Sequence, residues 1–236
     1  MRSFYPLLLF AGLAGVILLF PACKKDCYVH YESGGKNFNF QQLAVGQSAR
    51  YLGLLGEKYY MASTDDYVYT DDTLVLTIVA QDANGFKVAE ALHYQGDVDN
   101  GITDKDSTYY YYFHVQGDTL QIMPFGSGQQ VHSRIFTYFV RQQGLSLKTM
   151  TGQKVGITGW KTSFSYCECR QEGFAENYEQ FGVAYDTLNV LVDNSDMAVD
   201  GPGQTYVYSA ASGIVRFSTY SWWTQSGYGW DLLPVP

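Results

Sequence analysis

Aromatic side chains near the C-terminus are the residues of this chain best suited to bind a ligand. Trp222 and Trp223 are adjacent, and Tyr228 and Trp230 follow shortly after them. Neighbouring side chains of a strand point to opposite faces, so one tryptophan of the pair is expected to pack inward and the other to meet solvent or a ligand. Together these rings form a candidate platform for stacking a sugar ring or an apolar ligand. The alternative is that they only pack the sheet.

The run Tyr109–Tyr112 follows the same rule. Alternate rings of a strand point to opposite faces, so one pair of tyrosines is expected to pack inward while the other meets solvent or a ligand.

Standard catalytic signatures are missing from the sequence. It contains no Gly-x-Ser-x-Gly, no His-Glu-x-x-His, no phosphate-cradling loop and no dinucleotide fingerprint. The adjacent carboxylates Asp65-Asp66 and Asp71-Asp72 bracket Tyr67–Tyr69, where they are expected to solubilise a loop rather than act as an acid and base on sugars. We therefore expect no catalytic residues and no cofactor, with a hydrolase that lacks a recognisable motif as an alternative.

Metal binding is also not expected. The acidic loops Asp97–Asp106 and Asp193–Asp200 hold oxygen ligands that calcium favours, but the spacing of the first fails the EF-hand pattern. Cys167 and Cys169 would share one face of a strand, yet no histidine stands near them at ligand spacing.

Residues 1–22 differ in kind from the rest of the chain. Arg2 supplies a positive charge, and Leu7–Phe20 is apolar apart from two glycines. This apolar stretch is shorter than the roughly 20 residues that cross a bilayer as a helix. The segment is therefore interpreted as a signal peptide rather than a transmembrane anchor.

The segment Leu19–Asp26 (LFPACKKD) resembles the lipobox of bacterial lipoproteins. The resemblance implies cleavage before Cys23 and acylation of its sulfur and amino group, so that the chain binds a membrane through acyl chains. Burial of acyl chains yields about 0.8 kcal/mol per CH₂, and two or three chains hold firmly. Lys24, rather than Asp, after the cysteine implies the outer membrane and leaves open which leaflet carries the protein.

Three cysteines remain once Cys23 is acylated, in a compartment where disulfides form. Cys27 is expected to pair with Cys167 or Cys169, which would tie the N-terminal tether to the body, and the third thiol would stay unpaired or pair with another chain. The sequence does not decide between the two partners.

Composition excludes other classes of protein. The formal net charge is −8, so no basic surface is expected and we predict no nucleic-acid partner. With 46% hydrophobic and 17% aromatic residues, the chain can build one sizeable core. We expect residues 1–22 as the signal peptide, 23–38 as the lipidated cysteine and its tether, and 39–236 as a single β-rich domain.

Beyond the tether, apolar residues alternate at period two between glycine-containing turns, which indicates successive β-hairpins. Helix-tolerant composition occurs only at Arg170–Phe181. The pattern predicts an all-β fold, a curved antiparallel meander approaching an open barrel, with a two-sheet β-sandwich as the alternative. The expected strand pairs are 73–80 with 86–94, 107–115 with 119–125, 133–141 with 145–150, and 204–209 with 214–222.

A second resemblance concerns the ends of the domain. Leu43–Tyr51 resembles the opening strand of a group of uncharacterised β-rich bacterial outer-membrane lipoproteins, and Tyr206–Ser209, Gly213–Arg216 and Trp230–Leu233 resemble their closing hairpin and terminal strand. The resemblance implies the fold and an envelope location, and it carries no activity.

These observations predict a lipid-anchored, non-catalytic protein of the outer membrane. It would bind a glycan or an apolar ligand, within a concave face or through exposed aromatic rings. A structural or assembly subunit with an envelope protein partner is the alternative.

Overall fold

The computed structural model describes residues 38–56, 67–95, 106–126, 130–141, 144–159, 161–199, 201–221 and 226–234. The chain divides into residues 1–32 and residues 33–236, and everything described below belongs to the second part.

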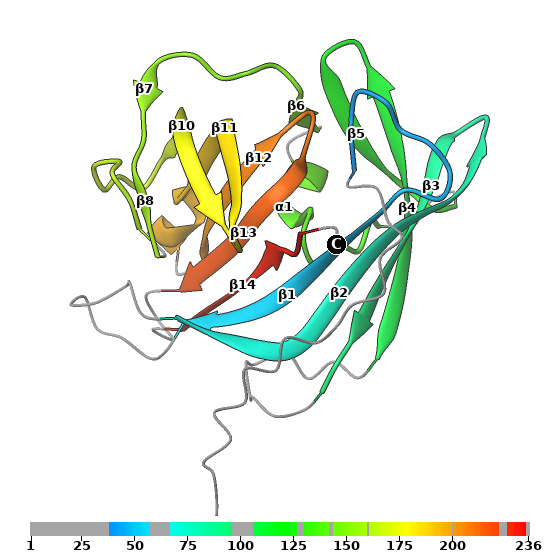
Figure 1. Cartoon of the computed structure of the whole chain (residues 1–236), viewed down its shortest axis with the longest axis horizontal. Coiled ribbons are helices and arrows are strands. Elements are labelled where there is room, and N and C mark those ends of the chain that lie inside the picture. Colours follow the sequence, from blue (N-terminus) through cyan, green and yellow to red (C-terminus); the bar gives the residue numbers. More distant parts are fainter. Residues whose placement is uncertain are drawn as a thin grey trace, which may run out of the picture. The chain divides into compact units, whose positions relative to one another are not determined.

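Twelve strands form one large sheet (Figure 1), and two further strands form a small one. The large sheet contains β1 (Ser48–Gly56), β2 (Tyr67–Asp82), β3 (Gly85–His93), β4 (Ser107–Gln116), β5 (Thr119–Pro124), β6 (Leu145–Ser146), β7 (Gln153–Lys154), β10 (Arg170–Gln180), β11 (Val183–Asp193), β12 (Gly203–Ser209), β13 (Gly213–Ser221) and β14 (Ser226–Leu232). The small sheet pairs β8 (Ile157–Thr158) with β9 (Lys161–Thr162).

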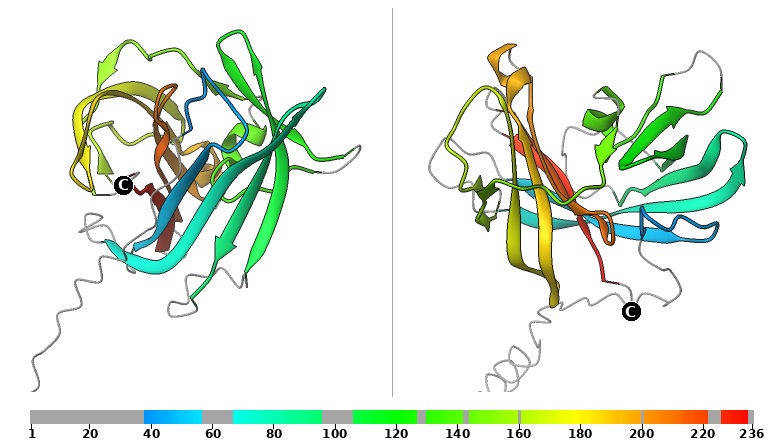
Figure 2. Two further views of the ribbon diagram at one scale, coloured as in Figure 1. Left: turned by 45° about the vertical axis from the view of Figure 1, so that its right-hand side comes forward. Right: turned by 90° about the horizontal axis from the view of Figure 1, so that it is seen from above.

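The large sheet consists of two meanders joined by the pairing of β1 with β14. Its strand order is β6-β5-β4-β3-β2-β1-β14-β13-β12-β11-β10-β7. All its pairs are antiparallel except β7 with β10. Within the described residues the edge strands β6 and β7 do not pair with each other, so the sheet curves without closing into a barrel (Figure 2). The predicted all-β curved meander is therefore confirmed, and the sandwich alternative is not observed.

The concave side of this sheet holds an aromatic core. Phe136 contacts Phe113 edge-on at a centroid distance of 5.2 Å, and Phe139 lies 4.5 Å from Tyr206. Tyr206 in turn packs on Phe217 of β13 at 4.8 Å. These rings connect strands from both meanders, so the core joins the two halves of the sheet.

The segment 133–141 is a helical turn, and the predicted strand there is wrong. The helix α1 (Thr137–Arg141) is preceded by a turn in which the Ser133 hydroxyl accepts a hydrogen bond of 2.9 Å from the Phe136 backbone amide. Ile135 and Phe136 are fully buried, and Phe136 packs on Phe113 of β4. Apolar residues that are buried on every side cannot show the alternation of a half-exposed strand.

The helix-tolerant segment Arg170–Phe181 does not form a helix, because it pairs with β11 and forms strand β10. The pairing runs from Arg170 opposite Asp193 to Gln180 opposite Val183. Gly173 pairs with Gln153 of β7. The two backbones lie so close together that a Cβ atom at position 173 would clash with the Gln153 carbonyl oxygen. The described helices are α1 and the 3₁₀ helix η1 (Ser195–Val199), and neither has the length and apolar character to cross a membrane.

Candidate functional site

Strands β3, β4 and β5 carry an exposed aromatic surface on the face opposite the core. Lys87, Tyr112 and Met123 stand side by side across the three strands, because Lys87 pairs with Tyr112 and Tyr112 with Met123. Tyr110 lies two residues before Tyr112 and shares its face. Phe125 follows directly after β5. We call Lys87, Tyr110, Tyr112, Met123 and Phe125 the aromatic surface.

Of the four tyrosines, Tyr110 and Tyr111 show the expected alternation between the two faces of the strand. Tyr111 is fully buried in the core, whereas Tyr110 is 46% exposed on the opposite face. Phe125 is 38% exposed, and its ring lies 6.0 Å from that of Tyr110 and 5.9 Å from that of Tyr112. Tyr112 itself is buried, so Tyr110 and Phe125 supply the open rings.

A lysine ammonium group lies against both open rings. The Lys87 Nζ is 4.9 Å from the ring centre of Tyr110 and 4.0 Å from that of Phe125. Attraction between the ammonium and the two π systems holds the rings and the lysine together, and it leaves a positive charge at the centre of the surface.

A carboxylate fixes the edge of the aromatic surface. The Tyr112 hydroxyl donates a hydrogen bond of 2.7 Å to Asp82 Oδ2, and the Asn84 backbone amide donates to Oδ1 at 2.7 Å. The hydrogen bond from Tyr112 lowers the pKa of Asp82 below its ordinary value, and the same bond raises the pKa of Tyr112. Asp82 therefore stays charged beside Lys87, so the surface presents both signs.

This arrangement is suited to binding a ring that has one apolar face and polar edges. Tyr110 and Phe125 provide the flat apolar area, while Lys87 donates hydrogen bonds and Asp82 accepts them. No group of three or more histidine, cysteine or acidic side chains in the described residues is arranged to hold a metal ion.

The aromatic residues singled out near the C-terminus are only partly described. Trp222 and Trp223 lie outside the described residues. Tyr228 and Trp230 share the core face of β14. Tyr228 is half-buried, with its ring 6.3 Å from Phe217, and Trp230 is 2% exposed. Trp230 therefore packs inside the sheet, where it offers no open ring for stacking.

Among the described residues, two buried polar atoms on that core face have no hydrogen-bond partner. They are the indole nitrogen of Trp230 and the hydroxyl of Thr219. Thr219 pairs with Tyr228 and Trp230 with Phe217, so the two residues are diagonal neighbours on β13 and β14.

Two buried charged clusters have an evident structural role. Arg216 forms an ion pair with Asp231, and Glu90 accepts hydrogen bonds from the hydroxyls of Ser133 and Tyr111 at 2.6 and 3.0 Å. Because their charges are paired and enclosed, neither cluster is open to a ligand.

The cysteines are joined differently from the expectation. A disulfide links Cys167 to Cys169, whereas the sequence predicted a bond from Cys27 to one of them. The two bonded residues are separated in the chain by one residue, while a bond from Cys27 must first close a loop of about 140 residues. Cys23 and Cys27 lie outside the described residues.

Sequence reasoning missed Lys87 and Phe125. Lys87 alternates with the buried Val88 in a predicted hairpin, which places it on the outer face. The signal was therefore present, but the register that sets Lys87 beside Tyr112 depends on the turns at either end of β3.

Comparison with known proteins gives no match: no family model, no curated protein and no solved structure matches the chain.

Proposed function

We propose that this chain is a lipid-anchored protein of the bacterial outer membrane that binds a glycan through its aromatic surface. The observation that carries the proposal is the pair of exposed rings, Tyr110 and Phe125, with the Lys87 ammonium between them. A sugar can stack its C–H face on such rings while its hydroxyls reach the polar groups beside them.

The charges on the surface favour a glycan over a purely apolar ligand. An apolar ligand would strip water from Lys87 and Asp82 without replacing their hydrogen bonds, which costs free energy. A glycan supplies hydroxyl donors and acceptors to both groups. The net charge of −8 disfavours a nucleic acid, whose bases would also stack on the rings.

The membrane part of the proposal is supported by the segment Leu19–Asp26, which ends a signal-like leader at Cys23. Acyl chains on Cys23 hold the protein at the membrane, and residues 24–38 connect it to the folded domain. The acidic domain is repelled by anionic lipid headgroups, which leaves its outer face open to a ligand.

The test measures binding of the mature chain to a panel of envelope glycans by isothermal titration calorimetry. Tyr110→Ala and Phe125→Ala each remove one stacking ring, and we expect about 5- to 100-fold weaker binding from the loss of one stacking contact. Tyr166→Ala is the matched control, because Tyr166 is 71% exposed but does not belong to the aromatic surface.

Equal binding by all three variants would contradict the assignment of the site. Failure of the unaltered chain to bind any glycan would contradict the proposed function. Selective binding of an apolar compound, or co-purification in a stable envelope complex, would instead favour an apolar-ligand carrier or an assembly subunit.

A further inference from the structure

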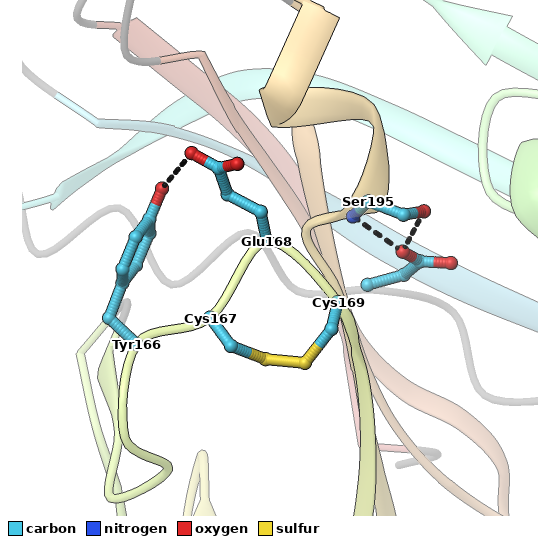
Figure 3. The surroundings of a disulfide bond; sticks show 6 residues. Tyr166, Cys167, Glu168, Cys169 and Ser195 are labelled. Atoms are coloured by element: carbon cyan, nitrogen blue, oxygen red, sulfur yellow. Dashed lines mark hydrogen bonds between the residues drawn. A yellow bond between two sulfur atoms is a disulfide. The ribbon is translucent and has the colours of Figure 1, made fainter.

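The disulfide between Cys167 and Cys169 lies at the surface, directly before β10 (Figure 3). Cys169 is exposed and Cys167 half-buried, and the bond spans a single residue, Glu168. The chain turns sharply at this residue, and the Glu168 side chain points away from the sulfur atoms (Figure 3).

This bond contributes little to holding the fold together. The neighbouring backbone is already fixed, because Arg170 pairs with Asp193 and the Asn194 amide donates a 3.1 Å hydrogen bond to the Cys169 carbonyl. A disulfide stabilises chiefly by closing a loop in the unfolded chain, and this one closes almost no loop.

We propose that the Cys167–Cys169 disulfide is a redox-active site that exchanges with thiols while the protein remains folded. Exchange requires that a thiolate can approach a sulfur atom in line with the bond, and exposed disulfides are the labile class. Because Cys169 is exposed, we expect a thiolate to reach this disulfide, whereas disulfides that hold a fold together are buried.

The co-reactant of this site is a dithiol. Its thiolate attacks one sulfur of the bridge, so that a mixed disulfide forms while the bond between Cys167 and Cys169 breaks and the other cysteine leaves as a thiolate that takes a proton from water. The second thiol of the reductant then attacks the mixed disulfide and releases the remaining cysteine. The protein gains two electrons and two protons, and the dithiol becomes a disulfide.

The charge of Glu168 controls the rate of the first step. Glu168 lies between the two cysteines in the sequence, and the Tyr166 hydroxyl lies 3.5 Å from its Oε1. Arg170, the nearest following cation, is engaged in an ion pair with Glu172. An incoming thiolate is therefore repelled by Glu168, and neutralising this residue should speed the exchange by about threefold at low salt.

The experiment incubates the mature full-length chain with excess dithiothreitol in the absence of denaturant. Free thiols are trapped with iodoacetamide at intervals and located by peptide mass mapping. We expect Cys167 and Cys169 to become alkylated while the circular dichroism spectrum stays unchanged. Reduction only in denaturant, or a bond from Cys27 to either cysteine in the untreated protein, would overturn the proposal.

Two variants test the role of charge. Glu168→Gln should speed alkylation about threefold, with the difference shrinking as salt is added. Glu179→Gln is the matched control, because it removes an exposed carboxylate at the far end of β10 and should leave the rate unchanged. Equal rates for Glu168→Gln and the unaltered chain would refute the assigned role of Glu168.

Discussion

Arg216 and Asp231 face each other across β13 and β14, and their side chains form a two-point ion pair inside the protein. Arg216 Nε lies 2.6 Å from Oδ1 of Asp231, and Nη2 lies 2.5 Å from Oδ2. The Tyr69 hydroxyl donates to the same Oδ2 at 2.8 Å, and Arg216 Nη1 donates to the Gly159 carbonyl at 2.9 Å. One ion pair therefore ties β2 and the β8–β9 turn to the last two strands.

Breaking this pair from one side should destabilise the fold strongly. Asp231→Asn leaves the Arg216 charge buried without its counter-ion, and we expect the free energy of unfolding to fall by about 3–5 kcal/mol. Urea denaturation followed by circular dichroism measures the change. The double variant Arg216→Met, Asp231→Leu removes both charges and should lose less than Asp231→Asn alone. A loss below about 1 kcal/mol for Asp231→Asn would contradict the burial of the pair.

Glu90 gives the fold a dependence on pH. Burial raises the pKa of Glu90 above its ordinary value of 4.5, although hydrogen bonds from Ser133 and the Arg134 amide favour its charged form. A carboxyl with a raised pKa binds its proton more tightly in the folded chain, so it destabilises the fold as pH rises above 4.5 through the folded-state pKa. Relative to Glu90→Gln, the unaltered protein should therefore lose free energy of unfolding as the pH rises above 4.5.

The control for this comparison is Asp118→Asn, which removes an exposed carboxylate paired with Lys148. Its effect on the free energy of unfolding should stay within about 1 kcal/mol at every pH. The raised pKa would be ruled out if the free energy of unfolding of the unaltered protein, minus that of Glu90→Gln, stayed constant or increased as the pH rises.

The ammonium of Lys87 should contribute modestly to glycan affinity. Lys87→Met keeps the length of the side chain but removes the charge against Tyr110 and Phe125, and the loss of an exposed cation–π contact corresponds to about two- to fivefold weaker binding. Calorimetric titration with the glycan bound by the unaltered chain measures this. Lys148→Met, which removes an exposed lysine of the same length elsewhere, should bind normally. Unchanged affinity in Lys87→Met would separate the lysine from the site.

Alternation of apolar residues was sufficient to predict most of the sheet. The expected pairs 73–80 with 86–94 and 107–115 with 119–125 correspond to β2–β3 and β4–β5, and 204–209 with 214–222 to β12–β13. Each is a local hairpin whose turn can be recognised from residues that tolerate a positive φ. Gly85, with a φ of +121°, is an example.

Features that depend on tertiary contact were not predictable. The helix α1 forms because Ile135 and Phe136 are enclosed by strands distant in the sequence, and β10 forms because β11 offers it a ladder. The aromatic surface likewise needs the register of three strands to bring Lys87 to Phe125. Trp230 shows the same limit, since the sequence left open whether its ring stacks on a ligand or packs the sheet, while the pairing of β14 with β13 places it in the core.

The proposed lipidation of Cys23 predicts where the protein partitions. Cys23→Ala removes the sulfur that carries an acyl chain, and loss of two or three buried chains should move the protein from the membrane fraction to the soluble one. Fractionation with immunoblotting measures this, and intact mass spectrometry of the unaltered protein should show a chain that starts at an acylated Cys23. An unmodified cysteine with the leader still attached would refute the anchor.

Trp230 should tolerate a change that usually destabilises a core. Trp230→Phe removes apolar volume, which destabilises the fold by roughly 1–2 kcal/mol. It also removes a buried N–H that has no acceptor in the part of the chain that the structure describes, and the desolvation of this group costs about 1–3 kcal/mol in the unaltered protein. Because these effects oppose each other, we expect the free energy of unfolding to stay within about 1 kcal/mol of the unaltered value in urea titrations. Phe217→Leu, in the directly paired position, removes volume with no such compensation and should destabilise more. A Trp230→Phe variant that lost more stability than Phe217→Leu would show that the indole nitrogen has an acceptor after all.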